Sequence, residues 1–185
     1  MDGALGWISE IIHWFGRFIP RLVIVRATHA GVRFRRGRDA YPVPPGLHIY
    51  WPLCTEMEVI PVARQTHNLP SQALLTRDGK RVVAGGVVVY RITDIVAAIS
   101  RNWDVSDTLN DISMLAITEV VTTHDLAHLL EHLTDDVQQK LTHVTRKRLR
   151  QYGVQVYRAF LTDFSECLII RNIGGGGLLL GHNME

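Results

Sequence analysis

The sequence predicts an α+β protein in which an antiparallel β-sheet module comes first and helices pack onto it. Short runs rich in Val and Ile fill the first half of the chain, and turn signals separate them. After Ile92 the apolar spacing becomes helical, and a last β-rich run follows at Val154–Phe164. This order of strands, helices and a final strand is typical of one mixed domain.

Length and composition agree with a folded domain. The chain has 185 residues, enough to bury a core, and its 46% apolar and 21% charged residues are ordinary globular proportions. These values argue against a disordered chain and against a polytopic membrane protein. The net charge of +2 is too small to indicate a nucleic-acid partner by itself.

The first strands follow from β-branched content and alternation. Leu22–Ala27 and Gly31–Arg36 are expected to form a hairpin at the start of the domain. Tyr41–Gly46 holds three prolines and is expected to be a rigid loop. Leu47–Trp51 and Met57–Thr66 are the next expected strands.

A second hairpin has a stronger signal. Thr76–Lys80 contains an Asp-Gly turn between two apolar runs. The long strand Arg81–Ile92 follows it, and Gly85 with Gly86 predicts a bulge or a close backbone approach there.

Four helices are expected after this strand, from caps and apolar spacing. They begin at Thr93 or Asp94, at Ser106 or Asp107, near Asp125 and near Thr134, and the last one ends at Tyr152 before Gly153. The final strand is Val154–Phe164.

The N-terminal segment is expected to be an amphipathic helix that lies on a membrane. Its apolar residues recur at helical spacing and include aromatic side chains suited to the headgroup region. Spanning is disfavoured, because about 20 apolar residues are needed and each central charge costs about 2.5–3.5 kcal/mol. The predicted membrane-inserting residues are Trp7, Ile8, Ile11, Ile12, Trp14, Phe15, Phe18 and Ile19.

Arginines close to this helix are expected to meet anionic lipid headgroups, because apolar insertion and charge attraction together anchor better than either alone. They are Arg17, Arg21, Arg33, Arg35 and Arg36. Two alternatives stay open for the helix: a re-entrant hairpin broken at Pro20, or burial in contacts with protein.

Several motifs resemble the superfamily of stomatin, prohibitin, flotillin and HflK/C, also called SPFH or band-7. Pro45–His48 followed by Pro52 is similar to the family's early PGLH…P stretch. Leu75–Gly79 and then Tyr90–Asp94 resemble its T-K/R-D-G … Y-R-I-x-D core, and Tyr152–Val156 resembles its W/Y-G-I-x-V entry to the last strand. The resemblance runs from about Val25 to Phe164.

The resemblance implies a membrane-tethered scaffold that assembles into rings or cages and organises membrane or client proteins. The expected parts are an anchor at 1–21, the family domain at 22–170 and a Gly-rich tail at 171–185. Members usually continue into a long helix, whereas here four glycines follow Ile173. A low ring is therefore expected, and the apolar tip Leu178, Leu179 and Leu180 is a candidate contact between copies. A monomeric peripheral lipid-binding module is the alternative.

Other chemistry has weaker signals. His124, His128 and His132 would lie along one stripe of an unbroken helix and could hold a metal, but no fourth ligand or HExxH motif accompanies them. No nucleophile motif or phosphate loop occurs. We therefore expect no enzymatic activity, no cofactor and no metal.

Two further features bear on partners and compartment. The cluster Arg146–Arg150 is expected to be a solvated helix end. No aromatic residues alternate with its basic residues, so no nucleic-acid partner is expected. Cys54 and Cys167 form no disulfide or zinc pattern, so a reducing, cytoplasmic compartment is expected, with Cys54 buried as a small apolar residue.

Overall fold

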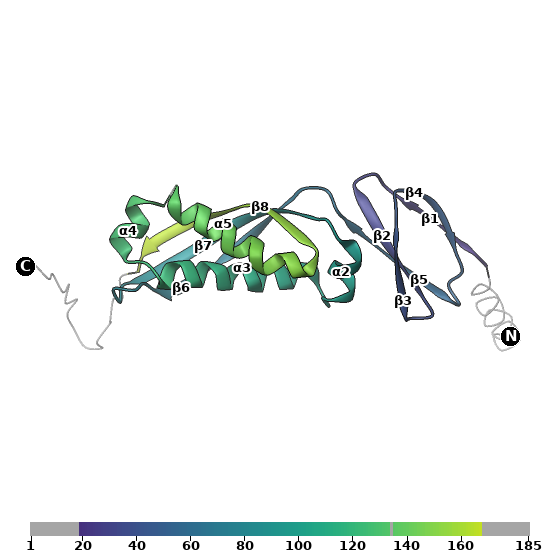
Figure 1. Cartoon of the computed structure of the whole chain (residues 1–185), viewed down its shortest axis with the longest axis horizontal. Coiled ribbons are helices and arrows are strands. Elements are labelled where there is room, and N and C mark those ends of the chain that lie inside the picture. The colour runs from purple at the N-terminus through teal and green to yellow at the C-terminus, as the bar shows by residue number, and fades with distance from the viewer. Residues whose placement is uncertain (1–18, 134, 168–185) are drawn as a thin grey trace, which may run out of the picture.

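The computed structural model describes residues 19–133 and 135–167. The molecule is elongated, with strands β1–β5 at one end and a helix-covered sheet at the other (Figure 1). We call these two regions the β module and the α/β part. The expected α+β class with antiparallel sheets is confirmed, but the strands form three sheets.

The β module contains two of these sheets. β1 (Arg21–Val25) pairs with β4 (Gly46–Tyr50), while β2 (His29–Arg35) lies between β3 (Asp39–Val43) and β5 (Thr55–Pro61). The predicted hairpin of the first two strands is therefore wrong. A hairpin with the predicted bounds would set arginines of β2 opposite the valines of β1. β4 instead sets Ile49 opposite Leu22 and Leu47 opposite Ile24, so the largest aliphatic side chains of the two strands pair with each other.

Two other expectations for this module were wrong in part. The predicted loop Tyr41–Gly46 begins inside β3, because β3 is an edge strand and an edge tolerates Pro42. The predicted strand Met57–Thr66 is broken after Pro61. There the chain turns toward the next sheet, and the amides of Val62 and Ala63 both donate to the carbonyl of Thr28.

The sheet of the α/β part has the order β6-β7-β8, formed by β6 (Gln65–Leu75), β7 (Arg81–Ile92) and β8 (Val154–Glu166). The Asp-Gly hairpin is confirmed, with Gly79 at a φ of 77°. The predicted irregularity is also present: the register shifts between Gly85 and Gly86. A Cβ on Gly86 would lie 2.5 Å from the carbonyl oxygen of Phe160, so a strand packs closely there.

Helices α2 (Ile95–Ser100), α3 (Val105–Thr122), α4 (Leu126–Glu131) and α5 (Asp136–Leu149) follow, and a 3-10 turn, η1 (Arg150–Tyr152), ends α5. Asp94 caps α2 as predicted, accepting from the amide of Ala97 at 3.0 Å. The cap of α3 is Asp104, not Ser106 or Asp107, because its carboxylate accepts from both of those amides.

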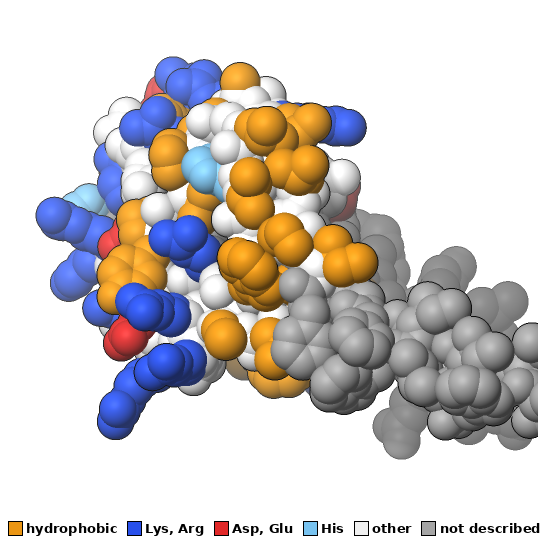
Figure 2. Space-filling model, turned by 90° about the vertical axis from the view of Figure 1, so that its right-hand side faces the viewer, with side chains coloured by type: hydrophobic (Ala, Val, Ile, Leu, Met, Phe, Trp, Pro, Cys, Tyr) orange, Lys and Arg blue, Asp and Glu red, His pale blue; other side chains and the backbone are white. Residues whose placement is uncertain are grey.

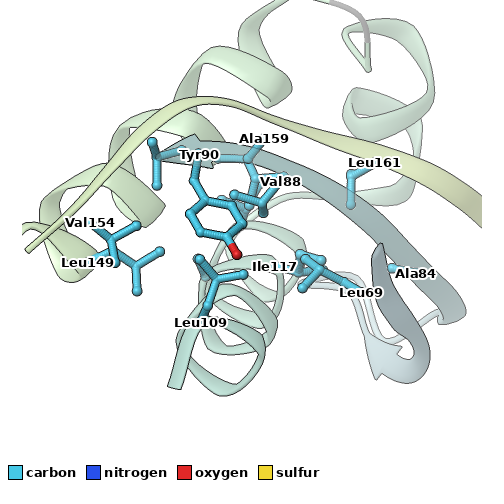
Figure 3. Packing of buried hydrophobic residues seen from close by; sticks show 14 of the residues in the cluster. Leu69, Ala84, Val88, Tyr90, Leu109, Ile117, Leu149, Val154, Ala159 and Leu161 are labelled. Carbon is cyan, nitrogen blue, oxygen red and sulfur yellow. The ribbon is translucent and has the colours of Figure 1, made fainter. Parts of the chain in front are cut away.

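The main core lies between the sheet and the helices. Figure 3 shows side chains of β7 and β8 around Tyr90 with Leu109 and Ile117 of α3 and Leu149 at the end of α5. These three helical residues are fully buried. Helix α3 lies over β6 and α5 over β8, so the two helices cover one face of the sheet.

Polar contacts secure the edges of the α/β part. Thr142 of α5 exchanges hydrogen bonds with the backbone of Ala159 in the edge strand β8. At the other end, Arg77 in the β6–β7 turn forms an ion pair with Asp125, which precedes α4. This guanidinium holds the pKa of the Asp125 carboxyl below its usual range.

Candidate membrane-contact surface

The two-stranded sheet exposes one apolar face. Its register sets Leu22 opposite Ile49 and Ile24 opposite Leu47, so these four side chains share a face. They are between 61% and 74% exposed. We call this surface the β1–β4 face.

The opposite side of the same strands is turned inward. Val25 of β1 is 2% exposed and His48 of β4 is half-buried, with its Nε2 2.8 Å from the carbonyl of Pro44. The inner side thus combines a buried valine with a half-buried histidine, and the leucines and isoleucines of this sheet all lie on the outer face.

More apolar side chains extend the β1–β4 face beyond its strands. Ile19 is 63% exposed before β1, while Trp51 and Leu53 are 53% and 52% exposed after β4. Figure 2 shows hydrophobic side chains gathered on this end of the molecule, with Lys and Arg side chains along one border. A contiguous exposed apolar patch with a basic border is typical of a surface that contacts a membrane or another protein.

The predicted headgroup arginines that lie within the described residues occupy three different places. Arg21 begins β1, whereas Arg33 and Arg35 lie on one face of β2. Arg36 lies in the β2–β3 turn with a φ of 53°. Arg33 reaches the border of the β1–β4 face, because it lines a small hollow together with Ile49.

Most of the predicted insertion residues lie outside the described residues. This applies to Trp7, Ile8, Ile11, Ile12, Trp14, Phe15 and Phe18, to Arg17, and to the tip Leu178, Leu179 and Leu180. Sequence reasoning missed the β1–β4 face itself. The runs Leu22–Val25 and Leu47–Tyr50 are apolar at nearly every position, and only strand pairing decides which side remains uncovered.

The histidine stripe is not on an unbroken helix. His124 precedes α4, His128 lies within it and His132 follows its last residue, with ring centroids 5.0 Å and 4.7 Å apart in sequence order. The His124 ring is already engaged: Nδ1 lies 2.7 Å from the Val120 carbonyl and Nε2 lies 3.2 Å from Lys140 Nζ. Residues 19–133 and 135–167 hold no group of three or more His, Cys, Asp or Glu placed to bind a metal.

Cys54 and Cys167 are both exposed. The expectation that Cys54 is buried was wrong, because the apolar stretch around it belongs to the exposed end of the β module and not to a core.

The basic cluster at the end of α5 is partly structural. Arg146 donates to the carbonyls of Val156 and Tyr157 at 2.9 Å and 3.0 Å, and Arg148 pairs with Glu119 of α3. Two of its cations therefore hold α5 against its neighbours and are not simply solvated.

In the described part of the chain, no helix has the length and apolar content needed to cross a bilayer.

Similar proteins occur in archaea and animals. The chain is 25% identical over 157 residues to an uncharacterised protein of Archaeoglobus fulgidus, covering 85% of this chain and 63% of that protein. It is 28% identical over 173 residues to stomatin-like protein 3 of Mus musculus, covering 87% and 59% respectively. A stomatin homologue of Pyrococcus horikoshii is 24% identical over 140 residues, covering 76% and 52%. The chain thus spans between half and two thirds of the length of these three relatives.

The family match covers both regions of the molecule. Residues 23–168 match the family described as SPFH domain / Band 7 family, from β1 through β8. Proteins of this family are typically membrane-associated. The chain therefore belongs to the SPFH domain / Band 7 family.

Proposed function

We propose that the protein is a non-enzymatic scaffold that sits on a bilayer surface and assembles from several copies. The single observation that supports membrane contact most is the β1–β4 face. A folded domain gains nothing from leaving four large aliphatic side chains more than 60% exposed on one side of one sheet. Insertion of this face beside the preceding N-terminal segment would bury them.

The membrane proposal is tested by vesicle flotation of the full chain. Ile24→Asp with Ile49→Asp should lower binding to anionic vesicles at least about tenfold, because burying each aliphatic side chain contributes about 1.5–3 kcal/mol. The matched control is Leu75→Asp with Leu130→Asp. These leucines are also exposed, at 51% and 60%, but they lie in the α/β part. Equal binding of both double variants and the parent would overturn the proposal.

Self-association is supported by two opposite sides of the α/β part. Gln72 of β6 donates to the Met114 carbonyl of α3 on one side, whereas Thr142 of α5 contacts β8 on the other. Because β6 and β8 are the two edges of the sheet, these sides face away from each other. Contacts between unlike opposite sides generate rings when the rotation closes.

The two sides carry opposite charge at the same level of the molecule. The connection from α2 to α3 lies beside the end of α5, since Arg101, the C-cap of α2, donates to the Gln151 carbonyl of η1 at 2.7 Å. Exposed Asp107 and Asp111 mark the α3 side there. Arg158 on the β8 side lines the groove between α5 and β8. A neighbouring copy placed side by side would set these charges opposite one another.

Charge reversal tests this arrangement. Asp107→Lys with Asp111→Lys should reduce the mass of the detergent-extracted assembly in light scattering, because like charges would then face each other. Adding Arg158→Glu should restore part of that mass. If Asp107→Lys with Asp111→Lys leaves the mass of the assembly unchanged, the side-by-side contact is wrong. If the parent itself is a monomer, a peripheral lipid-binding module is the function that remains. The tip Leu178–Leu180 remains a second proposed contact, which deletion of 174–185 tests in the same measurement.

A further inference from the structure

A polar hollow opens beside the β1–β4 face. It has a volume of about 460 Å³ and is lined by Arg33, Arg35, Tyr41 and Thr55. These residues come from the three adjacent strands β2, β3 and β5. The register sets Arg33 opposite Tyr41 and Arg35 opposite Thr55, so all four lie on the same face of their sheet.

Neither guanidinium is neutralised within the described residues, where the ion pairs involve other side chains. Asp39 is the cross-strand neighbour of Arg35 and shares its face, but the structure shows no ion pair between them. Glu56 and Glu58 lie opposite Phe34 and Val32 and therefore belong to the other face. Among the described residues, the hollow thus presents two arginines that form no ion pair beside one acid, so its net charge is positive.

The donor set of the hollow matches a phosphate group. Arg33 and Arg35 are two positions apart on one strand, so their Cα atoms lie roughly 7 Å apart and both guanidiniums lie on the same face. Each can donate two parallel N–H bonds to phosphate oxygens. The hydroxyls of Tyr41 and Thr55 add two uncharged donors from the neighbouring strands. A dianionic phosphomonoester would balance both arginines, whereas a carboxylate or a phosphodiester brings one charge.

The position of the hollow indicates where such a phosphate would come from. Arg33 also lines the adjoining hollow together with His48, Ile49 and Tyr50 of β4. The phosphate would therefore sit at the border of the surface that we propose to enter the bilayer, at the depth of lipid headgroups. We infer that this hollow binds the phosphomonoester headgroup of an anionic lipid, an inference that rests on the proposed membrane contact.

Four arginines lie close together in the sequence, but only two of them line the hollow. Arg36 and Arg38 follow Arg35 within three residues and are exposed, but they lie in the β2–β3 turn and do not line the hollow. A diffuse basic surface would use all four residues alike. A built site would depend on Arg33 and Arg35 and not on the other two.

Vesicle binding by the full chain tests this difference. Phosphatidylcholine vesicles carry either phosphatidic acid or phosphatidylserine at the same zeta potential. The parent should prefer phosphatidic acid, and Arg33→Gln with Arg35→Gln should abolish a preference of about tenfold, the size expected for losing charge-assisted hydrogen bonds. The control Arg36→Gln with Arg38→Gln removes the same charge and should weaken binding to both vesicles while keeping the preference. Equal loss of preference in both variants, or no preference in the parent, would overturn the site.

Hydroxyl variants and a soluble ligand complete the test. Tyr41→Phe with Thr55→Val leaves the charge unchanged and should reduce the preference for phosphatidic acid by a smaller factor. Free sn-glycerol 3-phosphate should raise the melting temperature of the parent above that in chloride of equal ionic strength, and Arg33→Gln with Arg35→Gln should remove the increase. No increase in the parent, together with no vesicle preference, would reject the site while leaving membrane contact intact. An increase that persists in Ile24→Asp with Ile49→Asp would show that the site stands even where docking fails.

Discussion

The two regions of the molecule use apolar residues in opposite ways. The α/β part buries most of its large aliphatic side chains, among them Leu109, Ile117 and Leu141, between helices and sheet. The buried hydrophobic residues among the described part of the β module are the valines Val25, Val32 and Val43. Its leucines and isoleucines are exposed instead, except Ile60, which is partly buried against the core. Stability is thus concentrated in one region and surface chemistry in the other.

This comparison implies that substitutions should separate by region. A change in the α/β part should alter the free energy of unfolding, whereas a similar change on the β1–β4 face should alter membrane binding. One prediction tests this separation across the two regions, and two others test the backbone within each region; they run from the largest expected effect to the smallest.

Gly153→Ala should have the largest effect on stability. Gly153 has a φ of 73°, and a Cβ there would lie 2.2 Å from the carbonyl oxygen of Asp94. Its own carbonyl accepts from the amides of Thr93 and Asp94, so the two segments cannot move apart without losing these hydrogen bonds. We expect a loss of at least about 3 kcal/mol in the free energy of unfolding, measured by chemical denaturation.

Gly79→Ala is the matched control for this loss. Gly79 has a similar φ of 77°, but nothing lies within 4 Å of the added Cβ. It should cost only about 1–2 kcal/mol for the left-handed conformation. Equal losses at the two glycines would show that the contact with Asp94 is unimportant.

Ile117→Ala and Ile24→Ala should differ both in size and in kind. Ile117 is fully buried on α3, and its truncation should cost about 2–5 kcal/mol. Ile24 is 74% exposed, and its truncation should change stability by less than about 0.5 kcal/mol while weakening vesicle binding. Denaturation and flotation on the same two variants give both values. Comparable destabilisation by both would mean that the β1–β4 face is covered within the chain.

Arg36→Gly should have a small, stabilising effect within the β module. Arg36 has a φ of 53°, which costs an ordinary residue about 1–2 kcal/mol. Glycine avoids this cost but loses about 0.5–1 kcal/mol more in chain entropy on folding. The net gain should be about 0.5–1 kcal/mol, visible as a higher melting temperature. Arg38→Gly, at a position without positive φ, should lower it instead; a gain there too would point to relief of charge repulsion rather than of backbone conformation.

Local signals explain which parts of the fold could be predicted. The long strand Arg81–Ile92, its Asp-Gly turn and the cap Asp94 depend on residues close in sequence, and the structure confirms them. The pairing of β1 with β4 could not be predicted in this way. It sets Leu22 opposite Ile49, and two other strands lie between these residues in the sequence. Which strand pairs with β1 depends on competition between several possible partner strands.

The candidate site shows the same division. The sequence by itself determined the α+β class, the family and the presence of arginines near an apolar N-terminal segment, because these depend on composition, spacing and motifs. Only the tertiary structure decided that Leu22 and Ile49 share an uncovered face and that Arg33 and Arg35, but not Arg36, line one hollow. The physical reason is that the side of a strand left exposed depends on which other strands and helices cover it, and those lie far away in the sequence.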